Sequence, residues 1–240
     1  MEALAMRAQA YPLAMDLKPI LLQNRTRQGF ITSDNPVVFY NQLLEARDFA
    51  SNTGLQSVGL QIFLPISPAY AVFFLDEDVY GVGRRRSSFL EITNPNDVHQ
   101  LNELQTISAA ENIYFNSAVV TSEYVLSVRE RTSGKRRKQK AHLHVQEEPS
   151  SDPETTRELI GISQQDIRND LNLSVIKVLK KASRARDDLM SRFVMRKPAW
   201  VKHFEMFREA VKAGKYTAAD FMQYMHDVET PAAPSVLEMS

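Results

Sequence analysis

At residues 29–40 the sequence reads Gly-Phe-Ile-Thr-Ser-Asp-Asn-Pro-Val-Val-Phe-Tyr, and this stretch decides the fold. One apolar run enters it at Phe30 and a second leaves it at Tyr40, with a polar knot, residues 32–36, between them. Two β-prone runs around a Ser/Asp/Asn/Pro cluster predict a strand, a tight turn and a second strand. Pro36 supports the turn, because it favours an extended conformation for the preceding residue and has no backbone N–H to donate.

The neighbouring apolar runs predict further strands of the same sheet. We expect Ile20–Leu22, Phe30–Thr32 and Val37–Tyr40 to be consecutive members of one sheet. Leu60–Leu64 predicts another strand, which we expect to stop at Pro65–Pro68 because proline cannot donate to the hydrogen-bond ladder.

Two more apolar runs come before the first long helix. Ala71–Leu75 is the most continuously apolar run of the chain, which predicts a strand buried on both faces. Phe89–Ile92 is shorter and predicts an edge strand. Asn94 and the acidic residue that follows it are typical of a helix start, and apolar residues at a spacing near 3.6 predict a helix from there to about Asn116.

The middle of the chain changes in composition. Val119–Arg131 alternates apolar and polar residues, so we expect a strand that returns through Leu143 and Val145 after a basic hairpin tip. Residues 147–162 have the composition of a flexible linker. A long helix is predicted from Ser163 to about Phe193, followed by shorter helices after Pro198 and Thr217.

These predictions define the fold class and the domain organisation. We predict an α+β fold, with a mixed or antiparallel sheet of about five to seven strands that is covered by helices. The predicted domains are an α+β domain over 1–146, the linker over 147–162 and a helical C-terminal region over 163–229. We expect residues 230–240 to form a disordered tail.

Composition excludes several classes of protein. The chain has 240 residues with 29 Lys and Arg against 29 Asp and Glu, so its net charge indicates neither a nucleic-acid partner nor a membrane. It has no cysteine, which excludes disulfides, thiolate catalysis and cysteine-ligated metals. No apolar run approaches the roughly 18 residues of a membrane span. We therefore expect a cytoplasmic protein with no membrane partner.

The order of several short motifs resembles a known family. Ile-Leu-Leu-x-Asn at residues 20–24, Thr-Ser-Asp-Asn-Pro-Val at 32–37 and Pro-Ile-Ser-Pro at 65–68 precede a helix that contains Leu-Asn at 101–102. Over residues 15–120 this order resembles the bacterial family known as domain of unknown function 4238. The resemblance implies a bacterial protein, and it implies no activity.

The chain also departs from that family pattern. Members usually begin with a His-Tyr-x-Pro-x-x-Tyr-Leu segment followed by helices, and the chain contains no such segment. We expect the chain to start inside the family domain, either as a natural short form or from a misplaced start. If the missing segment supplies catalytic groups, this chain is inactive.

Asp34, Ser33 and Asn102 are the candidate catalytic residues. Two strand ends and one helix could bring them to one edge of the sheet, where ligand sites occur in such folds. Asp34 could then act as a general base or bind a divalent cation, with its other metal ligands unknown. The alternative is a structural network, in which Asp34 and Ser33 cap the turn and Asn102 satisfies them.

The candidate binding residues lie in two places. Thr32 and Ser67 belong to the family-like motifs beside the predicted site. Arg136 and Arg137 belong to the basic run at 135–140, which could bind phosphates. That run lacks interleaved aromatic residues, so a nucleic-acid partner is not favoured.

Three functions remain open from the sequence. The first is a protein that acts by binding a partner, and the second is a metal-assisted hydrolase, such as a phosphodiesterase, centred on Asp34. The third is a nucleic-acid-associated accessory protein that uses the basic run. The oligomeric state, the partner and any substrate cannot be read from the sequence.

Overall fold

A computed structural model describes residues 11–47, 52–83, 88–135, 142–149, 156–163, 168–191, 194–217 and 219–229. The chain forms two compact units, and each is described by itself. The larger unit spans residues 17–194, and the smaller unit combines residues 1–16 with residues 195–240. The boundaries that we predicted at 146 and 163 fall inside the larger unit.

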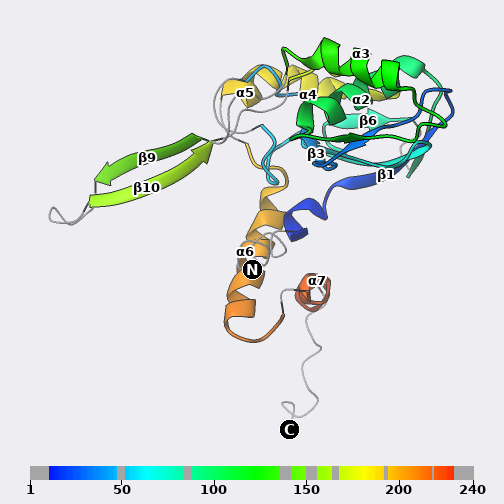
Figure 1. Cartoon of the computed structure of the whole chain (residues 1–240). Helices are drawn as coiled ribbons and strands as arrows, with labels where there is room; N and C mark the ends of the chain where they lie inside the picture. Colours follow the sequence, from blue (N-terminus) through cyan, green and yellow to red (C-terminus); the bar gives the residue numbers. More distant parts are fainter. Residues whose placement is uncertain are drawn as a thin grey trace, which may run out of the picture. The chain divides into compact units, whose positions relative to one another are not determined.

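The larger unit contains a mixed five-stranded sheet in the order β3-β4-β5-β1-β7, which confirms the predicted α+β class (Figure 1). Its strands are β1 (Lys18–Asn24), β3 (Val38–Tyr40), β4 (Gln61–Ser67), β5 (Tyr70–Leu75) and β7 (Phe89–Ile92). Neighbours are antiparallel except β1 and β7, which are parallel. β7 lies at one end of this order, as the prediction of an edge strand requires.

Two predictions about the central strands were wrong. β4 does not stop at Pro65 but continues to Ser67. Pro65 lies opposite Ala71 of β5, and the register with β5 shifts between Pro65 and Ser67. β5 is not buried on both faces. Ala71, Phe73 and Leu75 are buried, whereas the alternate residues are only partly buried. A sheet with one solvated face produces this alternation even where every residue is apolar.

The polar knot does not add a strand to the main sheet, contrary to our prediction. Its strand β2 (Thr32–Ser33) pairs with β8 (Ile113–Tyr114), so Thr32 lies opposite Tyr114 and Ser33 opposite Ile113. β1 and β3 are also not neighbours, because β5 and β4 lie between them. Adjacent runs in the sequence therefore do not give the strand order.

Helix α2 (Pro95–Ser108) covers one face of the sheet (Figure 1). Asn94 is its N-cap as predicted, since the Asn94 side chain accepts a hydrogen bond from the backbone N–H of Asn96. The helix ends eight residues earlier than the predicted Asn116. Beyond it the chain turns away to pair with the polar knot, and this long-range pairing overrides helix propensity.

The predicted strand over 119–131 is instead helix α3 (Ser122–Thr132). The Thr121 side chain caps it by accepting a hydrogen bond from the backbone N–H of Tyr124 at 3.2 Å. Val128 is buried while Leu126 is 60% exposed, so the apparent alternation in the sequence does not correspond to the two faces of a strand. The predicted pairing of this stretch with Leu143 and Val145 is therefore wrong.

Leu143 and Val145 lie in β9 (His142–Pro149), which pairs antiparallel with β10 (Thr156–Ser163). These two strands occupy much of the interval 147–162 that was predicted as a flexible linker. Residues 150–155 of that interval lie outside the described residues.

The predicted long helix from Ser163 to Phe193 is also wrong. Residues 168–178, here called the strap, are not helical: they include a turn at 174–175 and end in β11 (Ile176–Val178), which pairs with β6 (Tyr80–Val82). Within the described residues of the predicted helix, the helical segments are the short α4 (Lys180–Arg184) and α5 (Arg186–Ser191). Apolar residues at near-helical spacing in the strap belong to a non-helical segment that packs in the core.

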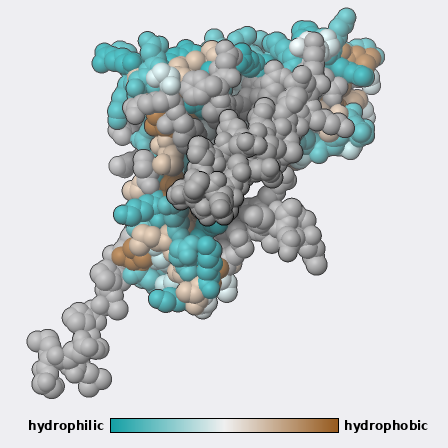
Figure 2. Space-filling model, turned by 90° about the vertical axis from the view of Figure 1, so that its left-hand side faces the viewer, coloured by the Kyte–Doolittle hydropathy of each residue, from teal (hydrophilic) through white to brown (hydrophobic). Residues whose placement is uncertain are grey.

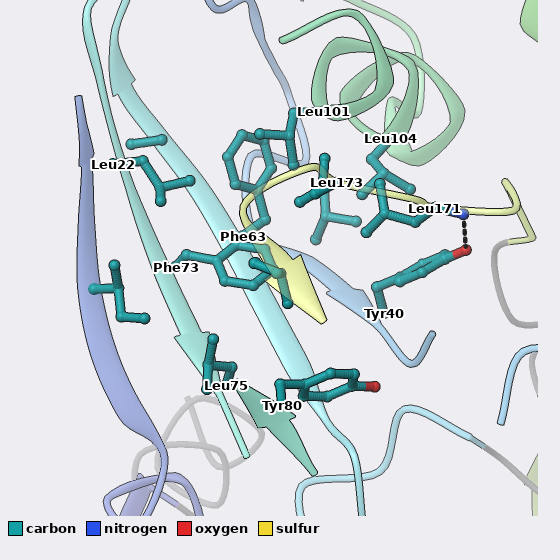
Figure 3. Packing of buried hydrophobic residues seen from close by; sticks show 14 of the residues in the cluster. Leu22, Tyr40, Phe63, Phe73, Leu75, Tyr80, Leu101, Leu104, Leu171 and Leu173 are labelled. Atoms are coloured by element: carbon teal, nitrogen blue, oxygen red, sulfur yellow. Dashed lines mark hydrogen bonds between the residues drawn. The ribbon is translucent and has the colours of Figure 1, made fainter. Parts of the chain in front are cut away.

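The strap completes the core of the larger unit. Its apolar residues Leu171, Leu173 and Ile176 are each 2% exposed and pack in one cluster with the sheet and α2. Figure 3 shows these contacts between α2, the sheet and the strap, through Leu101, Leu104, Phe63, Phe73, Leu171 and Leu173. Its dashed line marks the hydrogen bond from the backbone N–H of Leu171 to the hydroxyl of Tyr40, at 3.2 Å.

Polar groups attach the strap to α2 as well. The buried carboxylate of Asp97 accepts hydrogen bonds from the backbone N–H of Ser174 at 3.0 Å and from its hydroxyl at 2.6 Å. The side chain of Gln100 accepts one from the backbone N–H of Asn172 at 2.7 Å. Asp97 and Gln100 lie three residues apart, on one face of α2, and this face holds the strap.

The smaller unit consists of a short 3-10 helix η1 (Tyr11–Ala14), α6 (Pro198–Lys212) and α7 (Phe221–Glu229). The two later helices confirm the helices predicted after Pro198 and Thr217. Their core is the cluster Phe204, Phe207, Phe221, Tyr224 and Met225. A buried ion pair joins Arg196 to Asp16 at 2.8 Å. The predicted tail at 230–240 lies outside the described residues.

Candidate functional site

The polar knot is held against the end of α2 by the carboxylate of Asp34. Its Oδ1 accepts a hydrogen bond from the backbone N–H of Ala110 at 2.9 Å. Its Oδ2 accepts two more, from Glu111 at 2.8 Å and from Asn112 at 3.0 Å. The backbone N–H of Asp34 in turn donates to the carbonyl of Asn112 at 3.1 Å. Both carboxylate oxygens are thus engaged by the backbone that follows the helix.

These contacts shift the acidity of Asp34. Partial desolvation raises the pKa of the carboxyl, but the backbone N–H groups of Glu111, Asn112 and Ala110 stabilise the charged form and outweigh it. The pKa of Asp34 therefore lies below its ordinary value of 3.8. A lowered pKa makes this carboxylate a weaker general base, and its oxygens already have donors.

Ser33 is buried and bonds to α2. Its hydroxyl donates to Oε1 of Gln105 at 3.1 Å and accepts from the backbone N–H of Asn35 at 3.2 Å. Gln105 then donates through Nε2 to the carbonyl of Pro36 at 2.7 Å. The hydroxyl is consequently part of the turn, as expected for a serine that bonds its own backbone.

Asn102 is fully buried and bonds to the backbone at the start of the stretch from Gly29 to Pro36. Its Oδ1 accepts from the N–H of Ile31 at 3.0 Å, and its Nδ2 donates to the carbonyl of Gly29 at 3.0 Å. Nδ2 also donates to the hydroxyl of Tyr124 at 3.0 Å, and that hydroxyl lies 2.9 Å from Nδ1 of His99. Asn102 therefore has partners other than Asp34, the partner that the sequence suggested.

Three side chains of α2 that bond to the stretch from Gly29 to Pro36 lie in one line along the helix. Asn102, Gln105 and Ser108 are spaced by three residues, so their side chains lie on one face of α2. The first bonds to Gly29 and Ile31, the second to the middle of the knot, and Ser108 accepts from Nδ2 of Asn35 at 2.9 Å. This face docks the stretch from Gly29 to Pro36, and Asp34 bonds to the backbone just beyond the end of the helix, so Asp34, Ser33 and Asn102 hold one stretch through separate sets of hydrogen bonds.

Thr32 and Ser67 lie at a different feature, here called the Ile66 pocket. This pocket of about 280 Å³ is lined by residues 30–32, 65–68 and 114–116. Its rim carries exposed apolar side chains, since Ile66 is 58% and Tyr114 is 53% exposed. The Ser67 hydroxyl accepts hydrogen bonds from the backbone N–H groups of Ala69 and Tyr70, which form the turn between β4 and β5.

Sequence reasoning missed Gln105, Tyr124 and the exposed aromatic residues that follow α2. Gln105 could have been found, because its spacing from Asn102 places it on the same helix face. Tyr124 and Tyr114 could not, because the segments that contain them were assigned to a strand and to the continuation of α2. The apolar rim of the Ile66 pocket therefore had no signal in the predicted fold.

The remaining candidates are not placed at this site. Arg136 and Arg137 lie outside the described residues, so phosphate binding by them stays a prediction.

In the described part of the chain, no group of three or more His, Asp or Glu side chains could hold a metal ion. No helix there is long and apolar enough to cross a membrane. On the face drawn in Figure 2, the coloured surface is mostly hydrophilic, with small hydrophobic groups.

Comparison with known proteins gives one match. Residues 3–119 match the model of a family described as Protein of unknown function (DUF4238), a match that begins earlier than the residue 15 expected from the motifs. No curated protein and no solved structure matches the chain. The matched part ends before the strap, which supplies the core residues Leu171, Leu173 and Ile176. Residues 3–119, just under half of the chain, are therefore similar to the family described as Protein of unknown function (DUF4238).

Proposed function

We propose that this is a cytoplasmic bacterial binding protein that recognises an apolar peptide segment of a partner through the Ile66 pocket. The observation that carries the proposal is the exposure of Ile66, at 58%, and Tyr114, at 53%, on the rim of one apolar pocket. Large apolar side chains gathered at a hollow on the surface mark interaction sites more often than isolated ones do.

The geometry of the polar knot supports binding over hydrolysis. The oxygens of Asp34 accept three backbone hydrogen bonds, and the Ser33 hydroxyl donates to Gln105. A hydrolase built on these residues would need a carboxylate or hydroxyl that faces a substrate. Here the same groups connect the knot to α2. The Ile66 pocket is lined by residues 30–32 of the same stretch.

The size of the pocket supports a peptide ligand. Its volume of about 280 Å³ lies below the range of roughly 300–1,000 Å³ that is typical of small-molecule sites. Such a pocket fits one large apolar side chain of a segment that passes over the surface, as in other modes of peptide recognition. The absence of cysteine from the sequence agrees with a reducing cytoplasm.

Peptide display tests this proposal on the whole chain. A random peptide library displayed on phage is selected on the immobilised protein, and we expect enriched peptides that share an aromatic or aliphatic anchor. Because a carboxylate on the rim would be desolvated by that anchor, Ile66→Asp should weaken binding of the selected peptides by about tenfold or more.

The matched control is Leu126→Asp, since Leu126 is 60% exposed on α3 and does not line the pocket. Both variants should keep the melting temperature of the wild type, because both side chains are exposed. Selection that yields no common anchor, or equal binding to wild type and Ile66→Asp, would refute the proposal.

A further inference from the structure

A second and larger cavity lies where the strap joins the sheet region. It has a volume of about 950 Å³ and lies between β6, β11 and the turn that follows β5. Its lining includes Lys18 and Gly81 from the family-matched part, and Lys177 and Lys181 from the part beyond it. The volume lies near the upper end of the range of small-molecule sites, so this cavity suits a whole small molecule.

Glycines at two positions of the lining keep the cavity open. Lys177 of β11 lies opposite Gly81 of β6, and Gly83 follows directly after that strand. A Cβ atom on Gly81 would lie 3.0 Å from Cδ2 of Leu179, and one on Gly83 would lie 3.3 Å from Cδ1 of Leu90. Side chains at either position would therefore reach the apolar walls and occupy the space between them.

Lysines from three separate segments line the cavity. Lys18 comes from the first strand of the sheet, Lys177 from β11 and Lys181 from α4. Lys177 and Lys181 are exposed, and within the described part of the chain neither forms an ion pair with a carboxylate. Lysines brought to one cavity by separate segments suit a group with more than one negative charge, such as phosphate.

Two acidic residues line the same cavity. Glu77 and Asp78 follow β5, and their carboxylates are exposed. The buried carboxylate of Asp76 fixes this turn by accepting hydrogen bonds from the backbone N–H groups of Asp78, at 3.1 Å, and Gly59, at 2.8 Å. Carboxylates repel a phosphate but accept hydrogen bonds from hydroxyl groups, as acidic residues do with ribose in nucleotide sites.

We propose that this cavity binds a phosphorylated sugar, either free or as part of a nucleotide. The phosphate contacts Lys177 and Lys181, the sugar hydroxyls donate to Glu77 or Asp78, and the remainder of the ligand packs against Leu90 and Leu179. The site needs both the family-matched part and the strap. It is separate from the Ile66 pocket and does not depend on the function proposed there.

Calorimetric titration of the whole chain tests this proposal with three probes: ribose 5-phosphate, AMP and inorganic phosphate. We expect ribose 5-phosphate or AMP to bind more tightly than inorganic phosphate, and the stronger of the two identifies a free sugar or a nucleotide as the ligand. Lys177→Gln with Lys181→Gln should weaken that binding by about tenfold or more, because it removes two charged contacts.

The matched control carries Lys180→Gln and Lys202→Gln, which removes the same charge from exposed lysines that do not line the cavity. It should bind as the wild type does. Failure of all three probes to bind would overturn the proposal, as would equal loss of binding in the two double variants. Tightest binding of inorganic phosphate would also overturn it, since the sugar would then contribute nothing.

Discussion

Asp34 and Glu111 lie 77 residues apart in the chain, and the backbone N–H of Glu111 donates to Oδ2 of Asp34 at 2.8 Å. This bond and the two beside it turn the chain out of α2 and against the polar knot. The same carboxylate that looked like a candidate catalytic group in the sequence therefore serves to connect the motif to the helix. Variants of Asn102, of Leu173 in the strap and of His99 test the contacts around this helix.

Asn102→Ala should lower the free energy of unfolding by about 2–4 kcal/mol, because it leaves the N–H of Ile31 and the carbonyl of Gly29 buried without partners. Chemical denaturation of the variant and the wild type measures this difference. Asn172→Ala is the control, since its exposed side chain should contribute less than about 0.5 kcal/mol. Similar small losses in both variants would mean that Asn102 does not hold the stretch.

Leu173→Ala should cost about 2–5 kcal/mol, because Leu173 is 2% exposed in the core although it lies outside the family-matched residues. Leu126→Ala, at a side chain that is 60% exposed, should cost less than about 0.5 kcal/mol. Urea denaturation of both variants provides the comparison. If Leu173→Ala were as stable as Leu126→Ala, the strap would not be part of the core.

Stability should depend on the protonation of His99. Partial burial and the Arg131 guanidinium lower the pKa of His99 below its ordinary value of 6.5, while Glu103 acts in the opposite direction. The unfolded chain therefore takes up a proton near pH 6.5 while the folded protein stays neutral at this site, so the free energy of unfolding falls as the pH drops below 6.5 towards the lowered pKa.

Denaturation at pH 7 and at pH 5.5 detects this effect. His99→Gln removes the titrating group, so this variant should lose less stability than the wild type over the same interval. Equal losses of the free energy of unfolding in the wild type and in His99→Gln between pH 7 and pH 5.5 would contradict the assignment of this pH dependence to His99.

The parts of the fold that were predicted correctly depend on local signals. The apolar run at Ile20–Leu22 became β1, Asn94 caps α2, and Pro198 begins α6. In each case the residues that decide the structure lie within a few positions of one another. The α+β class follows from such elements without knowledge of their neighbours.

The parts that were wrong depend on contacts between distant residues. Nothing near Leu171 in the sequence indicates that its backbone N–H meets the hydroxyl of Tyr40, 131 residues away, so the strap was assigned to a helix. The pairing of Thr32 with Tyr114 similarly could not be read from either segment alone.

The candidate site shows the same difference between local signals and contacts between distant residues. That two strand ends and a helix bring Asp34, Ser33 and Asn102 to one edge of the sheet was a prediction from their positions in the sequence; Ser33 lies in β2, which pairs with β8, and Asn102 lies within α2. The partner of each side chain could not be predicted, because backbone N–H and carbonyl groups satisfy Asp34 and Asn102 and have no signature in the sequence. Residue types that serve both catalysis and turns cannot be told apart without those partners.

Asp34 connects the polar knot to the backbone that follows α2, and we expect it to form no metal-dependent catalytic site. Thermal melting of wild type, Asp34→Ala and the control Glu111→Ala, each with and without Mg²⁺ or Mn²⁺, tests this claim most directly. Glu111 contributes its backbone N–H to the network, so its side chain can be removed while the bond to Asp34 remains.

We expect Asp34→Ala to melt several degrees below the wild type and Glu111→Ala to melt with the wild type. We also expect neither cation to raise any of the three melting temperatures. Equal melting of wild type and Asp34→Ala, together with stabilisation of the wild type alone by a cation, would contradict the claim and identify a metal site at Asp34.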